Sequence, residues 1–296
     1  MFKKITLEDK PIFDEVFHRL QFLGSECTFT NLFIWRECYN ICWAQEDGFL
    51  LIQVLRDNTS FLLPPFGGKV EDLPSILQKL YKELGPFEMR GIYRDIIEEL
   101  EEALPGKLTY MLDRANSDYI YRAYNLATLS GRKYHQKKNH ANAFRKAYPN
   151  YQYVPMSKDI IKECLEFSQR WKDERGEQDY DDSLYCEMLA IKEALNNFEA
   201  LGFRGAAIVI DGKVEAMTFG EKINNDTAVI HVEKANPNIR GLYAVINQEF
   251  CQREWSDLKY INREEDMGIE GLRKAKQSYH PKYLLDKFVS KIDFGE

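Results

Sequence analysis

Residues 205–235, with the sequence GAAIVIDGKVEAMTFGEKINNDTAVIHVEKA, limit the possible folds of this chain more than any other segment. They contain three runs rich in apolar residues, separated by turn-forming residues at Asp211-Gly212 and at Asn224-Asn225-Asp226. Short turns of this kind connect neighbouring antiparallel strands. The segment therefore predicts a three-stranded antiparallel meander.

Predicted helices and strands flank this meander in a definite order. Apolar residues at helical spacing predict helices over residues 159–171 and 184–201 before it and over residues 242–255 after it. A short strand at Tyr260, a helix from Ile269 and a last strand over residues 283–289 follow. Two helices, a meander, and then helix, strand, helix and strand is the order of the GNAT acyltransferase fold, which this half of the chain resembles.

The first half of the chain shows a weaker version of the same order. Its predicted helices and strands include residues 7–20, 48–56, 60–68 and 71–84. We therefore predict an α/β (α+β) protein with two tandem GNAT-like units, at residues 1–125 and 126–296. Each unit is expected to contain a mixed, mainly antiparallel sheet flanked by helices.

The formal net charge of −7 argues against a protein that coats nucleic acid or anionic membranes over its whole surface. The charges are unevenly distributed, because no acidic residue occurs between Asp118 and Asp159. Basic and aromatic residues alternate in this segment, a combination that suits phosphate binding together with base stacking. The alternative is an amphipathic helix over residues 134–148 whose polar face is simply basic. We predict that donor phosphates bind to Arg132, Lys133, Lys137 and Lys138.

The sequence contains neither an apolar stretch long enough to span a membrane nor an N-terminal region typical of a signal peptide. We therefore expect a cytoplasmic protein. The six cysteines form neither a CxxC pair nor a Cys/His zinc spacing, so we expect reduced, buried thiols and no metal site. The sequence also lacks P-loop, GxGxxG and GxSxG motifs, which argues against nucleotide hydrolysis, dinucleotide redox chemistry and serine hydrolase chemistry.

The end of the meander and the helix after it carry the first candidate site residues. In HVEKANPNIRGLYAVIN, residues 231–247, Val232, Pro237, Arg240 and Gly241 are similar to the GNAT segment that opens the pyrophosphate-binding helix. The resemblance implies that Arg240 and Gly241 contact donor phosphates. In that motif, free backbone N–H groups and the helix dipole hold a diphosphate.

The same segment departs from the GNAT pattern and contains a candidate base. Tyr243 and Val245 stand where the later glycines occur, which favours a donor other than coenzyme A. The lack of a dedicated RNA-binding extension favours coenzyme A, so acyl-CoA and aminoacyl-tRNA both remain possible donors. Acyl transfer to an amine needs a base that accepts the amine proton, and Glu233 is the candidate. The alternative for Glu233 is a surface carboxylate at the end of a strand.

The segment YINREEDMGIEGLRKAKQSYHPKY, residues 260–283, places a charged cluster at a strand-to-helix junction, where ligands often bind in α/β proteins. Tyr279 is the candidate acid for the leaving group, and Lys276 is a further candidate phosphate ligand. The alternatives are structural: the cluster forms a surface ion-pair network, Asn262 caps a turn, and Tyr279 only packs. We predict that the acceptor amine binds to Asn262, Arg263, Glu264, Glu265 and Asp266.

Three separated segments, residues 118–146, 231–247 and 261–288, resemble the family of the C-terminal domain of phosphatidylglycerol lysyltransferase. The resemblance implies a tandem GNAT-like fold and transfer of an aminoacyl group from a charged tRNA to an amine or a lipid hydroxyl. No segment resembles the flippase part of the lysyltransferase, which disfavours a lipid acceptor. We expect a transferase that uses acyl-CoA or aminoacyl-tRNA and a small-molecule or peptide amine. The alternative is a non-catalytic module that binds RNA or an anionic metabolite.

Overall fold

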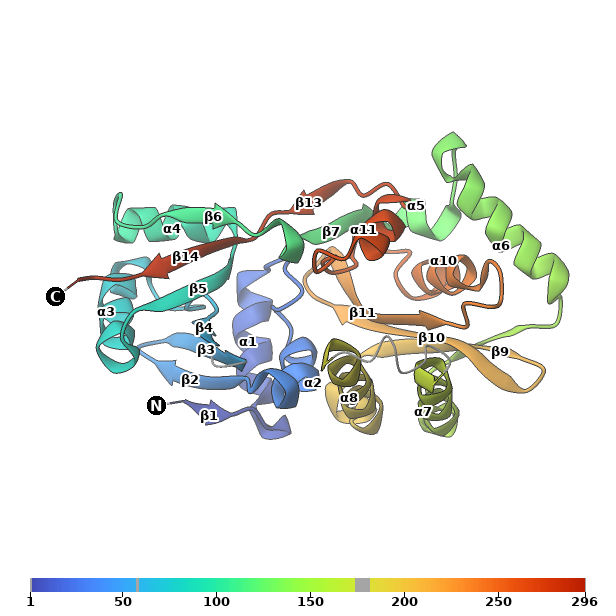
Figure 1. Ribbon diagram of the computed structural model, residues 1–296, viewed down its shortest axis with the longest axis horizontal. Coiled ribbons are helices and arrows are strands. Elements are labelled where there is room, and N and C mark those ends of the chain that lie inside the picture. The colour runs from blue at the N-terminus through green and yellow to red at the C-terminus, as the bar shows by residue number, and fades with distance from the viewer. Residues whose placement is uncertain (1, 57–58, 174–181, 296) are drawn as a thin grey trace. The chain divides into compact units, whose positions relative to one another are not determined.

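The computed structural model describes residues 2–56, 59–173 and 182–295 (Figure 1). The chain forms two compact units. The first contains residues 1–118, 265–269 and 284–296, and the second contains residues 119–264 and 270–283. The predicted division at residues 125 and 126 differs from these units, because the second unit begins at Tyr119 and the C-terminal residues belong to the first unit.

Within the described residues, the first unit has a seven-stranded sheet in the order β1-β2-β3-β4-β5-β14-β6. Strands β4 and β5 run parallel, and the other neighbouring strands run antiparallel. The strands are β1 (Lys3–Lys4), β2 (Cys42–Glu46), β3 (Phe49–Arg56), β4 (Thr59–Leu62), β5 (Phe87–Ile92), β6 (Tyr110–Leu112) and β14 (Phe288–Ile292). The helices are α1 (Lys10–Leu20), α2 (Phe29–Tyr39), α3 (Leu73–Leu84) and α4 (Arg94–Ala103).

The second unit has a sheet in the order β13-β7-β12-β11-β10-β9-β8. Its strands are β7 (Asp118–Arg122), β8 (Gln152–Pro155), β9 (Arg204–Ile210), β10 (Lys213–Lys222), β11 (Thr227–Ala235), β12 (Tyr260–Asn262) and β13 (Tyr283–Leu285). The helices are α5 (Ala123–Thr128), α6 (His135–Ala147), α7 (Lys158–Asp173), α8 (Asp182–Asn196), α9 (Phe198–Leu201), α10 (Leu242–Glu254) and α11 (Glu270–Gln277). In Figure 1, α10 lies on one face of this sheet, and α7 and α8 lie on the other.

The two sheets have corresponding strand orders. When the second is written as β8-β9-β10-β11-β12-β7-β13, each strand matches one of the first sheet. Each unit contains an antiparallel meander whose third strand runs parallel to the strand after the next helix. Each sheet also takes one strand from a distant part of the chain, β14 in the first and β7 in the second. The predicted fold class, two tandem GNAT-like α/β units, is confirmed.

The sequence pattern explains α3 but not α2. On α3, the predicted apolar stripe is buried at Leu73, Ile76, Leu77 and Leu80, and each fully buried side chain of this kind contributes roughly 1.5–3 kcal/mol. Helix α2 was not predicted, because it buries Phe29, Thr30, Leu32, Phe33 and Ile34 together and shows no amphipathic period.

Two further expectations need correction. The predicted last strand over residues 283–289 is two strands, β13 and β14, which belong to different sheets. Between them lies Lys287, which is 4% exposed. The expectation of reduced cysteines is correct for Cys27, Cys42, Cys164 and Cys251 and wrong for Cys38 and Cys186, which are disulfide-bonded.

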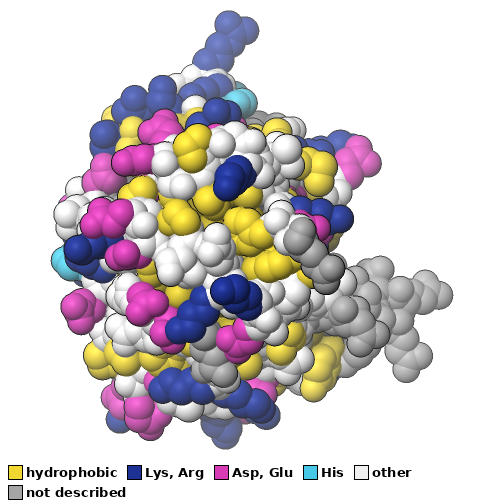
Figure 2. Space-filling model, turned by 90° about the vertical axis from the view of Figure 1, so that its left-hand side faces the viewer, with side chains coloured by type: hydrophobic (Ala, Val, Ile, Leu, Met, Phe, Trp, Pro, Cys, Tyr) yellow, Lys and Arg dark blue, Asp and Glu magenta, His cyan; other side chains and the backbone are white. Residues whose placement is uncertain are grey.

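The described surface mixes charges of both signs. On the face that Figure 2 presents, basic and acidic side chains are interspersed around scattered hydrophobic ones. None of the helices in the described part of the chain has the length and apolar character needed to span a membrane.

Candidate active site

The parallel strands β11 and β12 pair over only a short distance, and this leaves one end of β11 beyond the pairing. Strand β12 pairs with residues 227–229 of β11, whereas β11 continues to Ala235. Glu233, the candidate base, lies on this end, which pairs with β10 but not with β12. Its side chain therefore lies where the two parallel strands no longer contact each other through the backbone.

Glu233 is held by side chains from two other elements. Its Oε1 accepts a hydrogen bond from Nη2 of Arg263 at 2.9 Å, and its Oε2 accepts one from Nδ2 of Asn247 at 2.8 Å. Arg263 directly follows β12, and Asn247 lies on α10. The exposed fractions of the Glu233 and Arg263 side chains are 10% and 13%, so the ion pair is mostly buried but not sealed.

Each partner of Glu233 also carries a buried polar atom that has no hydrogen-bond partner among the described residues. Nη1 of Arg263 is an unpaired donor, and Oδ1 of Asn247 is an unpaired acceptor. Such atoms are rare in native proteins, and catalytic sites are one of the places where they occur. One donor and one acceptor of the site are thus buried without a hydrogen-bond partner among the described residues.

Aromatic rings and a second cation surround Arg263. Its guanidinium carbon lies 4.7 Å from the ring centre of Tyr279 and 5.6 Å from that of Tyr121. Nζ of Lys137, on α6, lies 4.1 Å from the ring centre of Tyr279. The structure therefore brings the candidate base, the candidate acid, one predicted acceptor ligand and one predicted phosphate ligand into a single cluster of the second unit. We call Glu233, Asn247, Arg263, Tyr279 and Lys137 the Glu233 cluster.

Burial determines the protonation states in this cluster. It raises the pKa of Tyr279 well above the usual value, outweighing the opposite effect of Arg263. It lowers the pKa of Lys137, and the charge of Arg263 lowers this pKa further. Tyr279 therefore keeps its phenolic proton at neutral pH. Burial also raises the pKa of the nearby Cys251 to about 12, so that this cysteine is a thiol and not a nucleophilic thiolate.

The other predicted phosphate ligands of the basic segment lie on the surface. Arg132 and Lys133 are exposed in the short 3₁₀ turn before α6, and Lys138 is exposed on α6 itself. Arg240 is exposed just before α10. None of these four side chains is part of the Glu233 cluster.

Helix α6 covers the start of α10 at Gly241. This glycine has a φ of +89°, and a Cβ there would lie 2.2 Å from the backbone oxygen of His140. Only glycine permits so close an approach. Of the two residues that replace the later motif glycines, Tyr243 is 36% exposed and Val245 is fully buried. The first turn of α10 is thus occupied by the protein's own backbone on the side of Gly241.

Two predicted ligands hold the local backbone. Oδ1 of Asn262 accepts a hydrogen bond from the backbone N–H of Glu264 at 2.7 Å, which is the turn-capping arrangement considered from the sequence. Nζ of Lys276 donates to the backbone oxygens of Arg263 and Glu264. These bonds fix the backbone on either side of Arg263.

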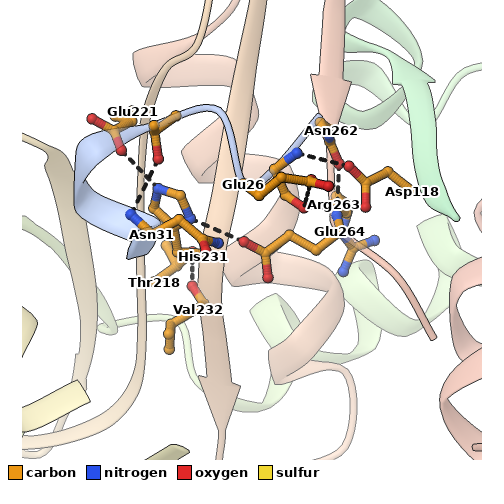
Figure 3. A network of polar contacts seen from close by, with 12 residues as sticks. Glu26, Asn31, Asp118, Thr218, Glu221, His231, Val232, Asn262, Arg263 and Glu264 are labelled. Atoms are coloured by element: carbon orange, nitrogen blue, oxygen red, sulfur yellow. Dashed lines mark hydrogen bonds and ion pairs between the residues drawn. The ribbon is translucent and has the colours of Figure 1, made fainter. Parts of the chain in front are cut away.

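Glu264 belongs to a second buried network, which Figure 3 shows. Nδ1 of His231 lies 2.9 Å from Oε1 of Glu264, and Nε2 lies 2.9 Å from Oε1 of Glu221. Burial disfavours the charged imidazolium, but the two carboxylates outweigh this effect and raise the pKa of His231 to about 9. His231 is therefore a cation at neutral pH and donates from both ring nitrogens.

Glu265 and Asp266 belong to networks of the first unit. Oδ2 of Asp266 pairs with Nη1 of Arg114 at 3.0 Å, and its Oδ1 accepts a hydrogen bond from the backbone of Gly268 at 2.9 Å. The charge of Glu265 helps to raise the pKa of Lys287. The structure therefore does not gather Glu264, Glu265 and Asp266 around one acceptor amine.

Sequence reasoning missed Asn247 and His231 as site residues. Asn247 is fully buried on α10. A single amide side chain in the apolar run LYAVIN was the signal that could have revealed it. His231 directly precedes the candidate strand end and had no partner nearby in the sequence. No group of three or more His, Cys, Asp and Glu side chains in the described ranges could hold a metal ion.

Comparison with known proteins finds relatives over nearly the whole chain. A crystal structure of a conserved protein of unknown function from Bacteroides thetaiotaomicron VPI-5482 is 40% identical, with 99% of each chain covered and a TM-score of 0.91. The structure of L-PGS from Bacillus licheniformis is 12% identical, with 99% of this chain and 95% of that chain covered and a TM-score of 0.67.

A sequence relative and a family description complete these findings. An uncharacterized protein of Mycoplasmoides gallisepticum, MYCGA3080, is 23% identical over 227 residues, which cover 76% of this chain and 68% of the relative. A sequence model described as "Phosphatidylglycerol lysyltransferase, C-terminal" matches residues 17–291. The chain therefore belongs to the phosphatidylglycerol lysyltransferase C-terminal family.

Proposed function

We propose that the second unit transfers an aminoacyl group from aminoacyl-tRNA to an amine. The observation that carries this proposal is the Glu233 carboxylate, fixed between Asn247 and Arg263 beside an unpaired donor. The family description supports it, because a lysyl group is an aminoacyl group. The packing of α6 against Gly241 favours a tRNA-linked donor over coenzyme A, whose usual seat includes the start of this helix.

In the proposed reaction the amine nitrogen attacks the carbonyl carbon of the aminoacyl ester, and a C–N bond forms. The carbonyl oxygen becomes an oxyanion, which the free Nη1–H of Arg263 stabilises in a site with little water. Glu233 accepts the proton that the attacking nitrogen loses.

The ester C–O bond then breaks, and the leaving oxygen of the ribose takes the phenolic proton of Tyr279. The proton held by Glu233 returns to Tyr279 and completes the cycle. Lys137 stabilises the transient phenolate, because its Nζ lies 4.1 Å from the ring centre of Tyr279. In this scheme Arg263 supplies electrostatic stabilisation, and Glu233 and Tyr279 move protons.

Glu233→Gln tests the proposal, because the amide keeps the shape of the side chain but does not act as a base. We expect a 10²–10⁴-fold slower transfer, measured at a temperature at which the variant is folded, because the substitution also removes one partner of a mostly buried ion pair. The measurement follows the loss of labelled amino acid from a charged tRNA pool in the presence of polyamines and short peptides.

Glu187→Gln is the matched control, since Glu187 pairs with Lys234, the neighbour of Glu233, at 2.6 Å. Its transfer rate should equal that of the wild type. Equal rates for Glu233→Gln and the wild type would refute the proposed chemistry. Retention of charged tRNA without any transfer, by wild type and variant alike, would favour the non-catalytic binding module.

A further inference from the structure

A pocket of about 600 Å³ lies between α6 and α10 in the second unit, and none of the residues of the Glu233 cluster lines it. Every residue of its wall has a polar side chain. The wall consists of Arg145, Gln248, Glu249, Gln252 and Arg253.

A buried carboxylate fixes the two arginines of this pocket. Glu249 is 5% exposed, and its Oε1 accepts hydrogen bonds from Tyr151 and, at 3.4 Å, from Nη2 of Arg145. Its Oε2 lies 3.0 Å from both Nε and Nη2 of Arg253. Two guanidinium groups from neighbouring helices are therefore held in place by one carboxylate, which leaves a net charge of +1.

Both arginines keep donors for a ligand. Arg145 uses Nε toward Tyr151 and Nη2 toward Gln248 and Glu249, whereas Arg253 uses Nε and Nη2 toward Glu249. Within the described ranges, Nη1 of neither side chain has a hydrogen-bond partner. The side chains of Arg145 and Arg253 are 34% and 55% exposed, so these donors are accessible from solvent.

We propose that this pocket binds phosphate groups of the nucleotide part of the donor, with the phosphodiesters of a single-stranded RNA end as the expected source. The identification of the donor rests on the proposed function. A guanidinium held in a fixed orientation is well suited to phosphate oxygens, which it can bind through two parallel N–H bonds.

The surroundings of the pocket favour an extended RNA over a single phosphate. Lys138 lies seven residues before Arg145 on α6, which places both on the same face about 10 Å apart along the helix. Lys146 adds a further exposed cation next to Arg145. The amides of Gln248 and Gln252 offer donors and acceptors to base edges.

Fluorescence anisotropy with a labelled eight-nucleotide single-stranded RNA tests this site on the full chain. We expect Arg253→Gln to weaken binding at least tenfold and to lower the slope of log affinity against log salt by about 0.7, the value for one lost phosphate contact on a single strand. Lys162→Gln, which removes an 84% exposed cation on α7, is the control and should stay within twofold of the wild type.

Arg253→Gln also removes a partner of the buried Glu249, so misfolding would lower its RNA binding as well. A second variant separates the loss of a phosphate contact from misfolding. Gln252→Glu adds a negative charge to the exposed wall of the pocket without touching this network, and we expect it to weaken RNA binding at least fivefold.

Affinities within twofold of the wild type for Arg253→Gln and Gln252→Glu would overturn the proposal, as would no binding of RNA or of labelled adenosine 3′,5′-bisphosphate by the wild type. Binding of the bisphosphate alone, lost in both variants, would keep the pocket and identify a coenzyme A type nucleotide as the source.

The proposed phosphate pocket and the proposed chemistry are refuted by different experimental outcomes. Glu233→Gln should bind the RNA as tightly as the wild type, because Glu233 does not line the pocket. Normal RNA binding with unchanged transfer by Glu233→Gln would refute only the chemistry. Slow transfer by Glu233→Gln with unchanged RNA binding by both pocket variants would refute only the pocket.

Discussion

The two units have the same strand order, but they differ in how completely the donors of a buried cation are hydrogen-bonded. In the first unit, Nζ of Lys287 lies 2.8 Å from Asp118, 2.7 Å from Glu26 and 3.2 Å from Ser25, which uses all three donors of the ammonium group. In the second unit, Arg263 leaves Nη1 unpaired among the described residues. A cation whose donors are all used stabilises the fold, whereas one with a free donor can also bind a substrate.

The two units also differ in the side chains at the end of the third meander strand, which are apolar in the first unit and ionisable in the second. Strand β4 is followed by Leu63 and Phe66, both buried, and the ring of Phe66 packs on Phe17 at 5.4 Å. The corresponding strand β11 carries His231 and Glu233 at its end. Apolar side chains cannot accept or donate protons, which agrees with the proposal that the second unit carries out the reaction. This topology therefore accommodates either apolar or ionic side chains at the same place.

The largest effect is expected from Lys287→Met, which leaves Asp118 and Glu26 buried without their cation. Removing one partner of a buried ion pair costs about 3–5 kcal/mol. Urea unfolding measures this loss, and Lys291→Met, at an exposed position on β14, is the control. An unfolding free energy unchanged by Lys287→Met would mean that the Lys287 network is not the stabilising one.

Arg263→Lys should instead affect the reaction. A lysine keeps the positive charge beside Glu233 but lacks the second terminal nitrogen that is free in Arg263. Loss of one oxyanion donor lowers a rate by about 10²–10³-fold, or roughly 3–4 kcal/mol. Single-turnover transfer measures this change. A transfer rate within threefold of the wild type would show that the free Nη1 has no part in the reaction.

The two units should also respond differently to pH. The pKa of His231 is raised from 6.5 to about 9, so its stabilisation is complete below pH 6.5 and is lost as the pH rises through about 9. The lost free energy is about 3 kcal/mol, from 1.36 kcal/mol for each unit of the pKa change. The Lys287 cluster keeps its charge over this range, because nearby carboxylates raise the pKa of Lys287 despite its burial.

Unfolding free energies of the wild type and Glu264→Gln between pH 6 and pH 9.5 test this difference. Glu264→Gln removes one of the carboxylates that raise the pKa of His231, so its deficit relative to the wild type should be largest at pH 6 and shrink toward pH 9.5. A deficit that is constant with pH would contradict a charged His231.

The smallest effect is expected from a pair of glycine substitutions at corresponding turns. Gly67 and Gly241 follow the third meander strand of each unit, with φ of +94° and +89°. An added Cβ at Gly67 would meet the flexible end of Arg19 at 2.7 Å, whereas at Gly241 it would meet the His140 backbone at 2.2 Å. Gly241→Ala should therefore destabilise the protein by about 1–3 kcal/mol more than Gly67→Ala in thermal unfolding. Equal losses would show that α6 moves aside easily.

The sequence predicted the parts of this protein that depend on local patterns. The meander carries clear turn residues, α3 and α6 carry apolar periods, and α10 is a largely apolar run. The order of these elements was enough to predict the fold class. Strands β7 and β14 could not be placed, because their positions depend on pairing with strands more than a hundred residues away.

The same limit applies to the candidate site. Glu233, Arg263 and Tyr279 were selected from their places at strand and helix ends, and the structure brings them together. Adjacent acidic residues were grouped because they are neighbours in sequence, yet Glu264 pairs with His231 and Asp266 with Arg114. Which partner a carboxylate finds is set by tertiary packing, and no local pattern encodes it.

A double-mutant cycle on the transfer rate with Glu233→Gln and Arg263→Lys tests the proposed reaction most directly. Residues that act as one catalytic unit are strongly non-additive. We expect each single variant to slow single-turnover transfer at least a hundredfold and the double variant to be no slower than the slower single one. Two losses that multiply, or single variants as fast as the wild type, would contradict the assignment of the reaction to this ion pair.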